Sequence, residues 1–381
     1  MKNACEEALS NLNTSPLGVE RVMFRTRDLL VVLLIVSSGS VAYARFAGGS
    51  LYTDEIWQEC LGYAILHGHL EAGSPFGCPY GQFGLVAKRG LDHPPLMGLM
   101  MALVLAAGLT PRFLPITFCT ITNLVMFIML RKRFVLATAT ALSFVFYQQY
   151  HQLLSMAFLD PGVSMFLMST IALTYLYRRV KNSRLLPLAG VTAGLATLSK
   201  EIGVASILYL ILFTIYDVRR GKRGKWGTHL EAIIIAFCLG AVWPIYGLAL
   251  QPKLFLDLIG HNAGRSILGT YGWQITMYSA VGVVYFRRDY FGWNGYDYVL
   301  VASWLATVYM FVRARGISEV KLGLLCFGSI FLLLRYPAIY LTISFFPFYS
   351  IAFGTITEDA YNYMMCTSGK RSYSRLESKG S

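Results

Sequence analysis

The sequence predicts an all-α polytopic membrane protein with about ten (roughly 9–13) transmembrane helices, whose first outer loop carries juxtamembrane helices. Three observations support this prediction. Of the 381 residues, 55% are hydrophobic and only 14% are charged, with a mean hydropathy of +0.52, whereas a soluble domain carries about 25% charged residues. Apolar runs recur almost end to end. Basic residues lie in short clusters between those runs, as is typical of cytoplasmic loops.

Each transmembrane helix needs about 17–25 mostly apolar residues to cross the hydrocarbon core. Two stretches, 95–109 and 273–286, are shorter and are expected to be either short spans or helices lying at the membrane interface. The candidate spans are 29–47, 112–130, 134–150, 159–177, 185–200, 202–217, 230–250, 297–313, 319–335 and 338–355.

Charged residues around the first run predict its orientation. Arg21, Arg25 and Arg27 precede the run, and the loop 48–94 that follows holds five acidic residues against Lys88 and Arg89. The positive-inside rule then places the N-terminus in the cytoplasm and this loop outside. The first run lacks a cleavage signal and is interpreted as a retained span.

With neither short stretch crossing, both termini lie inside and the basic clusters fall on the cytoplasmic face. The predicted organisation is a cytoplasmic tail (1–28), one transmembrane catalytic domain that includes the outer loop (29–355), and a C-terminal tail (356–381).

Unusual ionisable residues gather on the predicted outer face. Asp54 and Glu55 follow the first span, His93 closes the outer loop, and Asp160, Lys200 and Arg335 lie at outer ends of later spans. Singly, each has an ordinary explanation: a solvated flank, a capping residue, a helix start or a snorkelling side chain. Together they place carboxylates and cations beside lipid, within reach of water.

This combination suits glycosyl transfer from a lipid phosphate. An acceptor hydroxyl needs a carboxylate as general base. A leaving phosphate needs cations or fixed hydrogen-bond donors where its charge develops. The lipid tail of the donor needs the bilayer, so such a site belongs at the membrane interface.

These residues lie in segments that resemble a known family, the GT-C fold glycosyltransferases. Thr53-Asp54-Glu55 resembles their acidic motif after the first span. Two elements resemble the protein O-mannosyltransferase and aminoarabinose transferase branch, His93-Pro94-Pro95-Leu96 and Phe158-Leu159-Asp160-Pro161. Gly194-Leu195-Ala196-Thr197-Leu198-Ser199-Lys200 and Arg335-Tyr336-Pro337 are similar to later elements of that branch. The five motifs occur in the family's order between about residues 29 and 350.

The resemblance implies an inverting, metal-independent transfer of a hexosyl or pentosyl group from a polyprenyl- or dolichyl-phosphate sugar. No cofactor is expected, since the lipid-linked sugar is itself the donor substrate. The acceptor would be a glycan, lipid or protein on the extracytoplasmic side of the cell membrane. By the family's pattern Asp54 is the base with Glu55 beside it, and Asp160 is a second acid that orients acceptor or sugar.

His93, Lys200 and Arg335 with Tyr336 are the candidates for binding the lipid phosphate and sugar. Aminoarabinose transferases carry Lys where this chain has His93, so the charge there depends on pH. The chain also leaves little room for a large outer domain after its last spans, which leaves the acceptor open.

The sequence also has features that bear on other functions. The net charge of +13 is explained by the loop clusters, so no nucleic-acid partner is expected. A secondary transporter or flippase is the alternative, but no internal repeat is visible and the polar residues favour one face over the midplane. A catalytically inactive partner subunit is a third possibility.

Two smaller features also leave alternatives open. Cys60 and Cys78 share the outer loop as either a disulfide or two free thiols. Gly190 and Gly194 suit close helix packing either within the chain or between chains.

Overall fold

The structure is a computed structural model. It describes residues 25–48, 53–68, 94–150, 159–219, 226–267, 285–286, 295–296, 298–334 and 344–377.

Each predicted span coincides with a helix of the structure over its described part. Within the described residues, these helices are α2 (Thr26–Phe46), α6 (Phe113–Leu130), α7 (Phe134–Tyr150), α8 (Asp160–Val180), α9 (Leu185–Ser199), α10 (Val204–Arg219), α11 (Trp226–Leu250), α14 (Tyr298–Arg313), α15 (Ser318–Leu334) and α16 (Phe346–Glu377). A short 3-10 turn, η2 (Glu201–Gly203), joins α9 to α10. The remaining elements are α3 (Thr53–Leu66), α5 (Leu96–Ala106), α12 (Pro252–Ile267) and the antiparallel strands β1 (Tyr285–Phe286) and β2 (Gly295–Tyr296). The prediction of a helical polytopic membrane protein is therefore confirmed, with this strand pair as a small addition.

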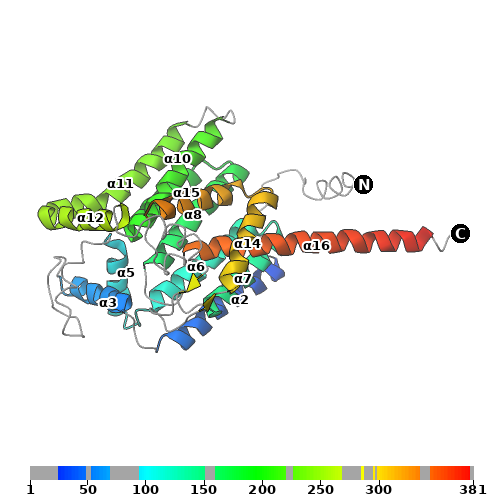
Figure 1. The fold of residues 1–381 in the computed structure, drawn as a ribbon, viewed down its shortest axis with the longest axis horizontal. Coiled ribbons are helices and arrows are strands. Elements are labelled where there is room, and N and C mark those ends of the chain that lie inside the picture. Colours follow the sequence, from blue (N-terminus) through cyan, green and yellow to red (C-terminus); the bar gives the residue numbers. More distant parts are fainter. Residues whose placement is uncertain are drawn as a thin grey trace.

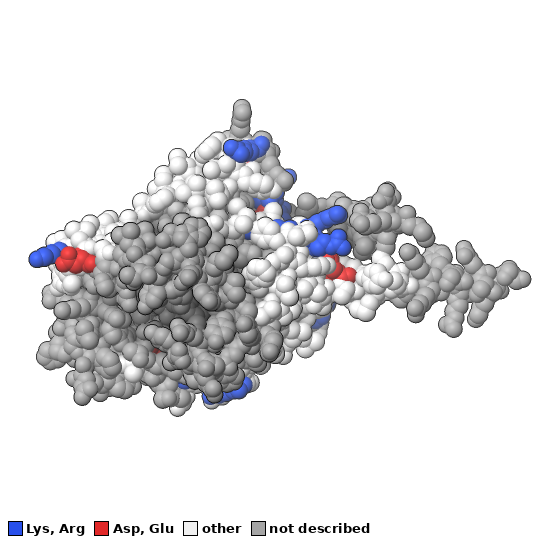
Figure 2. All heavy atoms as spheres, viewed as in Figure 1, with Lys and Arg blue, Asp and Glu red and all other residues white. Residues whose placement is uncertain are grey.

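The surface of the bundle is apolar enough to face lipid. Among the described residues, four helical segments are long and apolar enough to cross a bilayer by length and composition, namely α2, α6, η2 with α10, and α11. Leu30 and Leu33 of α2 are 64% and 61% exposed, a degree of apolar exposure that water disfavours along a whole helix. In Figure 2 the described surface is mostly uncharged, and Lys, Arg, Asp and Glu occur in small groups. The chain is an integral membrane protein.

Helices α8, α9 and α11 pack side by side, and α9 contacts α11 through small residues. A Cβ atom added to Gly190 would meet the backbone of Ala232, and one added to Gly194 would meet Leu239 Cβ. Glycine lets the two backbones approach closely at both positions. Packing within one chain therefore accounts for the two glycines, which resolves the alternative that the sequence left open.

Helices α6 and α8 are in contact. They run in the same direction, because Arg133 just after α6 and Arg178 near the end of α8 contact the neighbouring residues Arg315 and Glu319, so their first residues define one end of the bundle. Arg112 precedes α6 and Asp160 begins α8. Six residues along each helix, the rings of Phe118 and Phe166 lie 6.3 Å apart. Arg112 and Asp160 are thus level with one another, and we call this end of the bundle the site end.

The opposite end gathers the basic clusters of the sequence. Arg133 pairs with Glu358 and donates to the carbonyl of Arg315. Arg178 pairs with Glu319 and approaches Asp217 at 3.8 Å. These contacts join ends of α7, α8, α10, α15 and α16, so Arg133 and Arg178, from two clusters that the sequence assigned to one face, do lie at one end of the bundle.

Helices α3 and α5 pack against each other at the site end (left in Figure 1). Their 14 and 11 residues give lengths of about 21 and 17 Å, against about 30 Å of hydrocarbon. Gly62 of α3 lies against Met101, and Gly98 of α5 lies against Leu61, so the pair is tightly crossed. The short helix α5 favours the alternative in which the stretch 95–109 lies at the membrane interface. Of 273–286, only β1 lies within the described residues.

Candidate active site

Asp160 lies at the start of α8, followed by Pro161 in the first turn. Proline suits that position because the first turn leaves backbone N–H groups without intrahelical partners. The positive end of the helix dipole favours a carboxylate there. The Asp160 side chain is only 1% exposed. The start of a helix alone does not compensate a buried negative charge, so the carboxylate needs a partner of opposite charge.

Lys200 supplies the opposite charge. Helix α9 ends at Ser199, and Lys200 follows in an extended conformation, where a cation suits the negative end of the dipole. Its Nζ lies 2.9 Å from Oδ2 and 3.1 Å from Oδ1 of Asp160. The structure thus unites two residues that the sequence identified in separate motifs.

The turn after Lys200 depends on Gly203. A Cβ atom added there would overlap the carbonyl of Ala196 in the last turn of α9. Only glycine allows the chain to fold back this closely before α10 begins. This tight turn holds the Lys200 backbone at the end of α9.

The ion pair borders an apolar cluster formed by α5, α6 and α8. Met97, Phe118, Leu159 and Met165 belong to it, and the sulfur of Met97 packs against Gly162. Moving two charges out of water often costs more free energy than their mutual attraction regains, so a buried ion pair is weak evidence for stability. In a membrane protein, a buried ionisable pair is a functional-site hypothesis.

A second buried ion pair lies at the same end. Arg112 donates to Glu55 through Nε (2.8 Å to Oε1) and Nη2 (2.7 Å to Oε2), with side chains 1% and 0% exposed. Arg112 Nη1 also donates to the carbonyl of Phe46 at 2.6 Å. One guanidinium thus ties α3 to the end of α2 and the start of α6, in the fork geometry that suits arginine.

Sequence reasoning missed Arg112. A lone arginine at the start of a span is usually an interfacial anchor, which hides its role. The available signal was its position: it is the cation that lies between the short run 95–109 and the next span, in a region otherwise poor in charge.

The other predicted site residues are placed less fully. Asp54 lies in the first turn of α3, but its side chain is outside the described residues. His93, Arg335 and Tyr336 also lie outside them. Glu55 is placed, and its carboxylate binds Arg112. The roles assigned to all of these residues stay predictions.

Cys60 is disulfide-bonded, which agrees with one of the two alternatives for the outer loop. Cys78, its expected partner, is outside the described residues. Within the part of the chain that the structure describes, no group of three or more His, Cys, Asp or Glu could hold a metal ion. Metal-independent chemistry stays a prediction.

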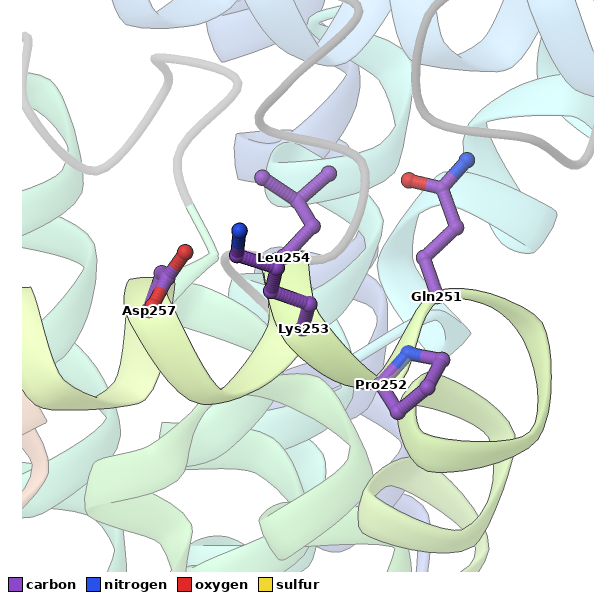
Figure 3. Close-up of a pocket in the computed structure, with 5 residues that line it drawn as sticks. All are labelled: Gln251, Pro252, Lys253, Leu254 and Asp257. Atoms are coloured by element: carbon purple, nitrogen blue, oxygen red, sulfur yellow. The ribbon is translucent and has the colours of Figure 1, made fainter.

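An open recess of about 420 Å³ lies where α11 turns into α12. Figure 3 shows Gln251, Leu254 and Asp257 projecting to one side of this turn. Pro252 and Lys253 complete the lining. None of the site residues whose side chains are described, Glu55, Asp160 and Lys200, lines this recess.

A family model described as dolichyl-phosphate-mannose-protein mannosyltransferase matches residues 92–246, a segment that contains Asp160 and Lys200. No curated protein matches the chain significantly.

Among solved structures, ArnT from Cupriavidus metallidurans, bound to undecaprenyl phosphate, is similar with a TM-score of 0.57 and 13% sequence identity. The match covers 86% of this chain and 59% of that chain, so the present chain spans less than two thirds of its neighbour's length. The two comparisons agree with the motifs of the sequence: the chain has the fold of the GT-C membrane glycosyltransferases.

Proposed function

We propose that this chain is a glycosyltransferase that moves a sugar from a polyprenyl- or dolichyl-phosphate donor to an acceptor hydroxyl. The observation that carries the proposal is the buried Asp160–Lys200 pair, level with the Glu55–Arg112 pair that anchors the acidic helix α3. Carboxylates and cations thus meet at one end of a lipid-facing bundle. The matched family is described by dolichyl-phosphate-mannose, and the structural neighbour was solved with undecaprenyl phosphate.

In this proposal Asp54 is the general base. Its carboxylate takes the proton of the acceptor hydroxyl while that oxygen attacks the anomeric carbon of the donor sugar. The bond between the anomeric carbon and the phosphate oxygen breaks, and its electron pair leaves with the lipid phosphate. Attack opposite to the leaving group inverts the anomeric configuration.

The cations of the site would stabilise the charge that develops on the leaving phosphate. Lys200 is the candidate whose position is described, and Asp160 holds its ammonium at a defined place. Asp160 would also orient the acceptor or the sugar. His93, Arg335 and Tyr336 complete the proposed phosphate and sugar contacts.

The site would lie on the non-cytoplasmic side of the cell membrane, with the N-terminus in the cytoplasm. The distribution of basic residues supports this orientation, because the end opposite the site carries Arg133, Arg178 and the clusters around them. Glycan, lipid and protein hydroxyls all remain acceptors that this site would fit.

Asp54→Asn is expected to lower sugar transfer by about 100-fold or more, because loss of a general base costs this much. The measurement is transfer of radiolabelled sugar from native polyprenyl-phosphate sugars to endogenous membrane acceptors. Asp257→Asn is the matched control, since Asp257 is an exposed acid of α12, and it should transfer at the wild-type rate.

Equal labelling by wild type and Asp54→Asn across several donors, with both proteins inserted, would contradict the proposal. Movement of lipid-linked sugar across vesicles that persists in Asp54→Asn would instead favour a transporter or flippase. The labelled product of the wild type would identify the acceptor.

A further inference from the structure

A buried histidine and a buried aspartate meet at the end of the bundle opposite the site end, and they take no part in the proposed mechanism. His229 lies near the start of α11 and Asp217 near the end of α10, and both side chains are 1% exposed. Nε2 of His229 lies 3.4 Å from Oδ2 of Asp217, and Nδ1 lies 3.3 Å from the hydroxyl oxygen of Thr214. One imidazole thus contacts α10 through both of its ring nitrogens. Buried ionisable residues in a membrane protein call for a functional explanation.

Aromatic rings lie on two sides of this imidazole. The ring of Tyr177 stands edge-on to that of His229 at 5.6 Å, and the ring of Phe213 lies 6.0 Å away, between centroids. Buried surroundings of this kind strengthen the attraction between opposite charges and make an uncompensated charge costly. The charge of His229 therefore affects the free energy of folding more than it would at an exposed position.

Asp217 also joins the ion pairs at this end of the bundle. Its Oδ1 lies 3.8 Å from Nε of Arg178, and the same guanidinium pairs with Glu319 of α15. Arg178 is therefore shared between two carboxylates. The imidazole of His229 is a second group beside Asp217 that can carry a positive charge.

The charged and titratable groups described around His229 come from several helices. They are Tyr177 and Arg178 of α8, Asp217 of α10, Glu319 of α15 and, on α11 itself, the exposed Glu231. Helix α9, which packs along α11, has no titratable side chain between Leu185 and Ser199. Histidine ordinarily changes its charge between pH 5 and 8, whereas carboxylates, phenols and guanidinium groups titrate outside that range. A change of pH within this range therefore acts on the cluster through the imidazole.

We propose that His229 and Asp217 form a pH-sensitive contact that holds α10 against α11 when the imidazole is protonated. This inference goes beyond the proposed function and does not depend on it. The imidazolium donates to the carboxylate as a charged partner, and such hydrogen bonds are about twice as strong as neutral ones. A neutral imidazole keeps at most a hydrogen bond to Asp217, so the buried carboxylate loses a compensating charge.

The contact contributes stability at low pH, where the imidazole is charged, and this contribution is lost as the pH rises through the titration of His229. Its loss acts first on the start of α11. Ala232, about one turn after His229, is the residue against which Gly190 of α9 packs. Release of the contact therefore loosens α11 from α10 at the place where α11 also meets α9.

His67 near the end of α3 provides a contrast. It is exposed, and its Nδ1 lies 2.8 Å from the carbonyl oxygen of Tyr63 in the same helix. Within the described part of the chain, His67 forms no ion pair, so its charge should have little effect on the fold. His67→Gln is therefore the matched control for His229→Gln.

The test compares the wild type, His229→Gln, Asp217→Asn, the double variant and His67→Gln in the full chain in detergent. Thermal midpoints are measured between about pH 5.5 and pH 8.5, the range in which histidine changes its charge. Limited trypsin digestion at each pH is the second measurement. The segment 220–225 between α10 and α11 contains Lys222, Arg223 and Lys225, so the cutting rate reports how often the two helix ends separate.

Across this range the midpoint of the wild type should fall by about 2–4 °C more than that of His229→Gln or Asp217→Asn. His67→Gln should follow the wild type. At the low end of the range trypsin should cut the wild type several-fold more slowly than His229→Gln, and at the high end the two rates should be similar. Comparing variants at the same pH removes the pH dependence of trypsin itself.

Parallel pH profiles for the wild type, His229→Gln and Asp217→Asn would overturn the inference. So would a midpoint that rises with pH in the wild type relative to His229→Gln, because burial would then favour the neutral imidazole. If a single variant is too unstable to measure, the double variant decides, since it leaves neither charge behind. A double variant with the wild-type pH profile would overturn the inference, and a flatter profile would support it.

Discussion

Lys200→Met is expected to abolish most transfer, lowering the rate by at least about 100-fold, as loss of a preorganised charge at a reacting phosphate implies. The same change leaves the carboxylate of Asp160, 1% exposed, without its cation. Removing one partner of a buried pair is strongly destabilising. The thermal midpoint in detergent should therefore fall together with the transfer rate.

A double variant separates the two effects. Asp160→Asn combined with Lys200→Met removes both charges, so the thermal midpoint should recover while transfer stays low. Lys321→Met is the control at the opposite end of the bundle, where Lys321 donates to the carbonyl of Phe311 at 2.7 Å, and it should transfer normally. If the double variant transferred sugar at the wild-type rate, the Asp160–Lys200 pair would be a purely structural contact.

Arg112→Met should give the largest loss of stability, about 3–5 kcal/mol in the free energy of unfolding, because Glu55 would remain buried and charged without a partner. Transfer should fall as well, since α3 would lose its link to α2 and α6 and with it the position of Asp54. Unfolding in detergent, followed by tryptophan fluorescence, measures the first effect. The radiolabel assay measures the second.

The matched control for this change is Arg184→Met, since Arg184 is an exposed residue that precedes α9. An exposed site of this kind should shift the free energy by no more than about 0.5 kcal/mol. Glu55→Met combined with Arg112→Met should recover only part of the loss, because the carbonyl of Phe46 would still lack its donor. Equal stability of Arg112→Met and Arg184→Met would contradict the importance of the buried pair.

Apolar run length predicted the helices well because lipid imposes a simple rule on spanning segments. The sequence assigned residues 356–381 to a C-terminal tail without giving it a structure, and α16 continues through most of that stretch to Glu377 (Figure 1). Helix formation does not require an apolar sequence once the first turns are held by packing. Polar composition therefore marked a change of environment and not the end of the helix.

The sequence predicted several residues of the candidate site but not which of them contact one another. Asp160 and Lys200 stood out as charges at span ends, yet their pairing depends on how α8 packs against α9. Arg112 was missed because a polar residue at a span end usually faces water, and only tertiary structure shows that it is buried. The order of the motifs in the sequence indicated which end of the bundle holds the candidate site.

The Asp160–Lys200 pair also has a consequence for how the protein is made. The two residues lie 40 positions apart, at the two ends of a helical hairpin formed by α8 and α9. At about 5–20 residues per second, a ribosome completes Lys200 some 2–8 s after Asp160. Until then the acid has no cation at its side, so α8 and α9 are expected to enter the bilayer as one unit and not as successive single helices.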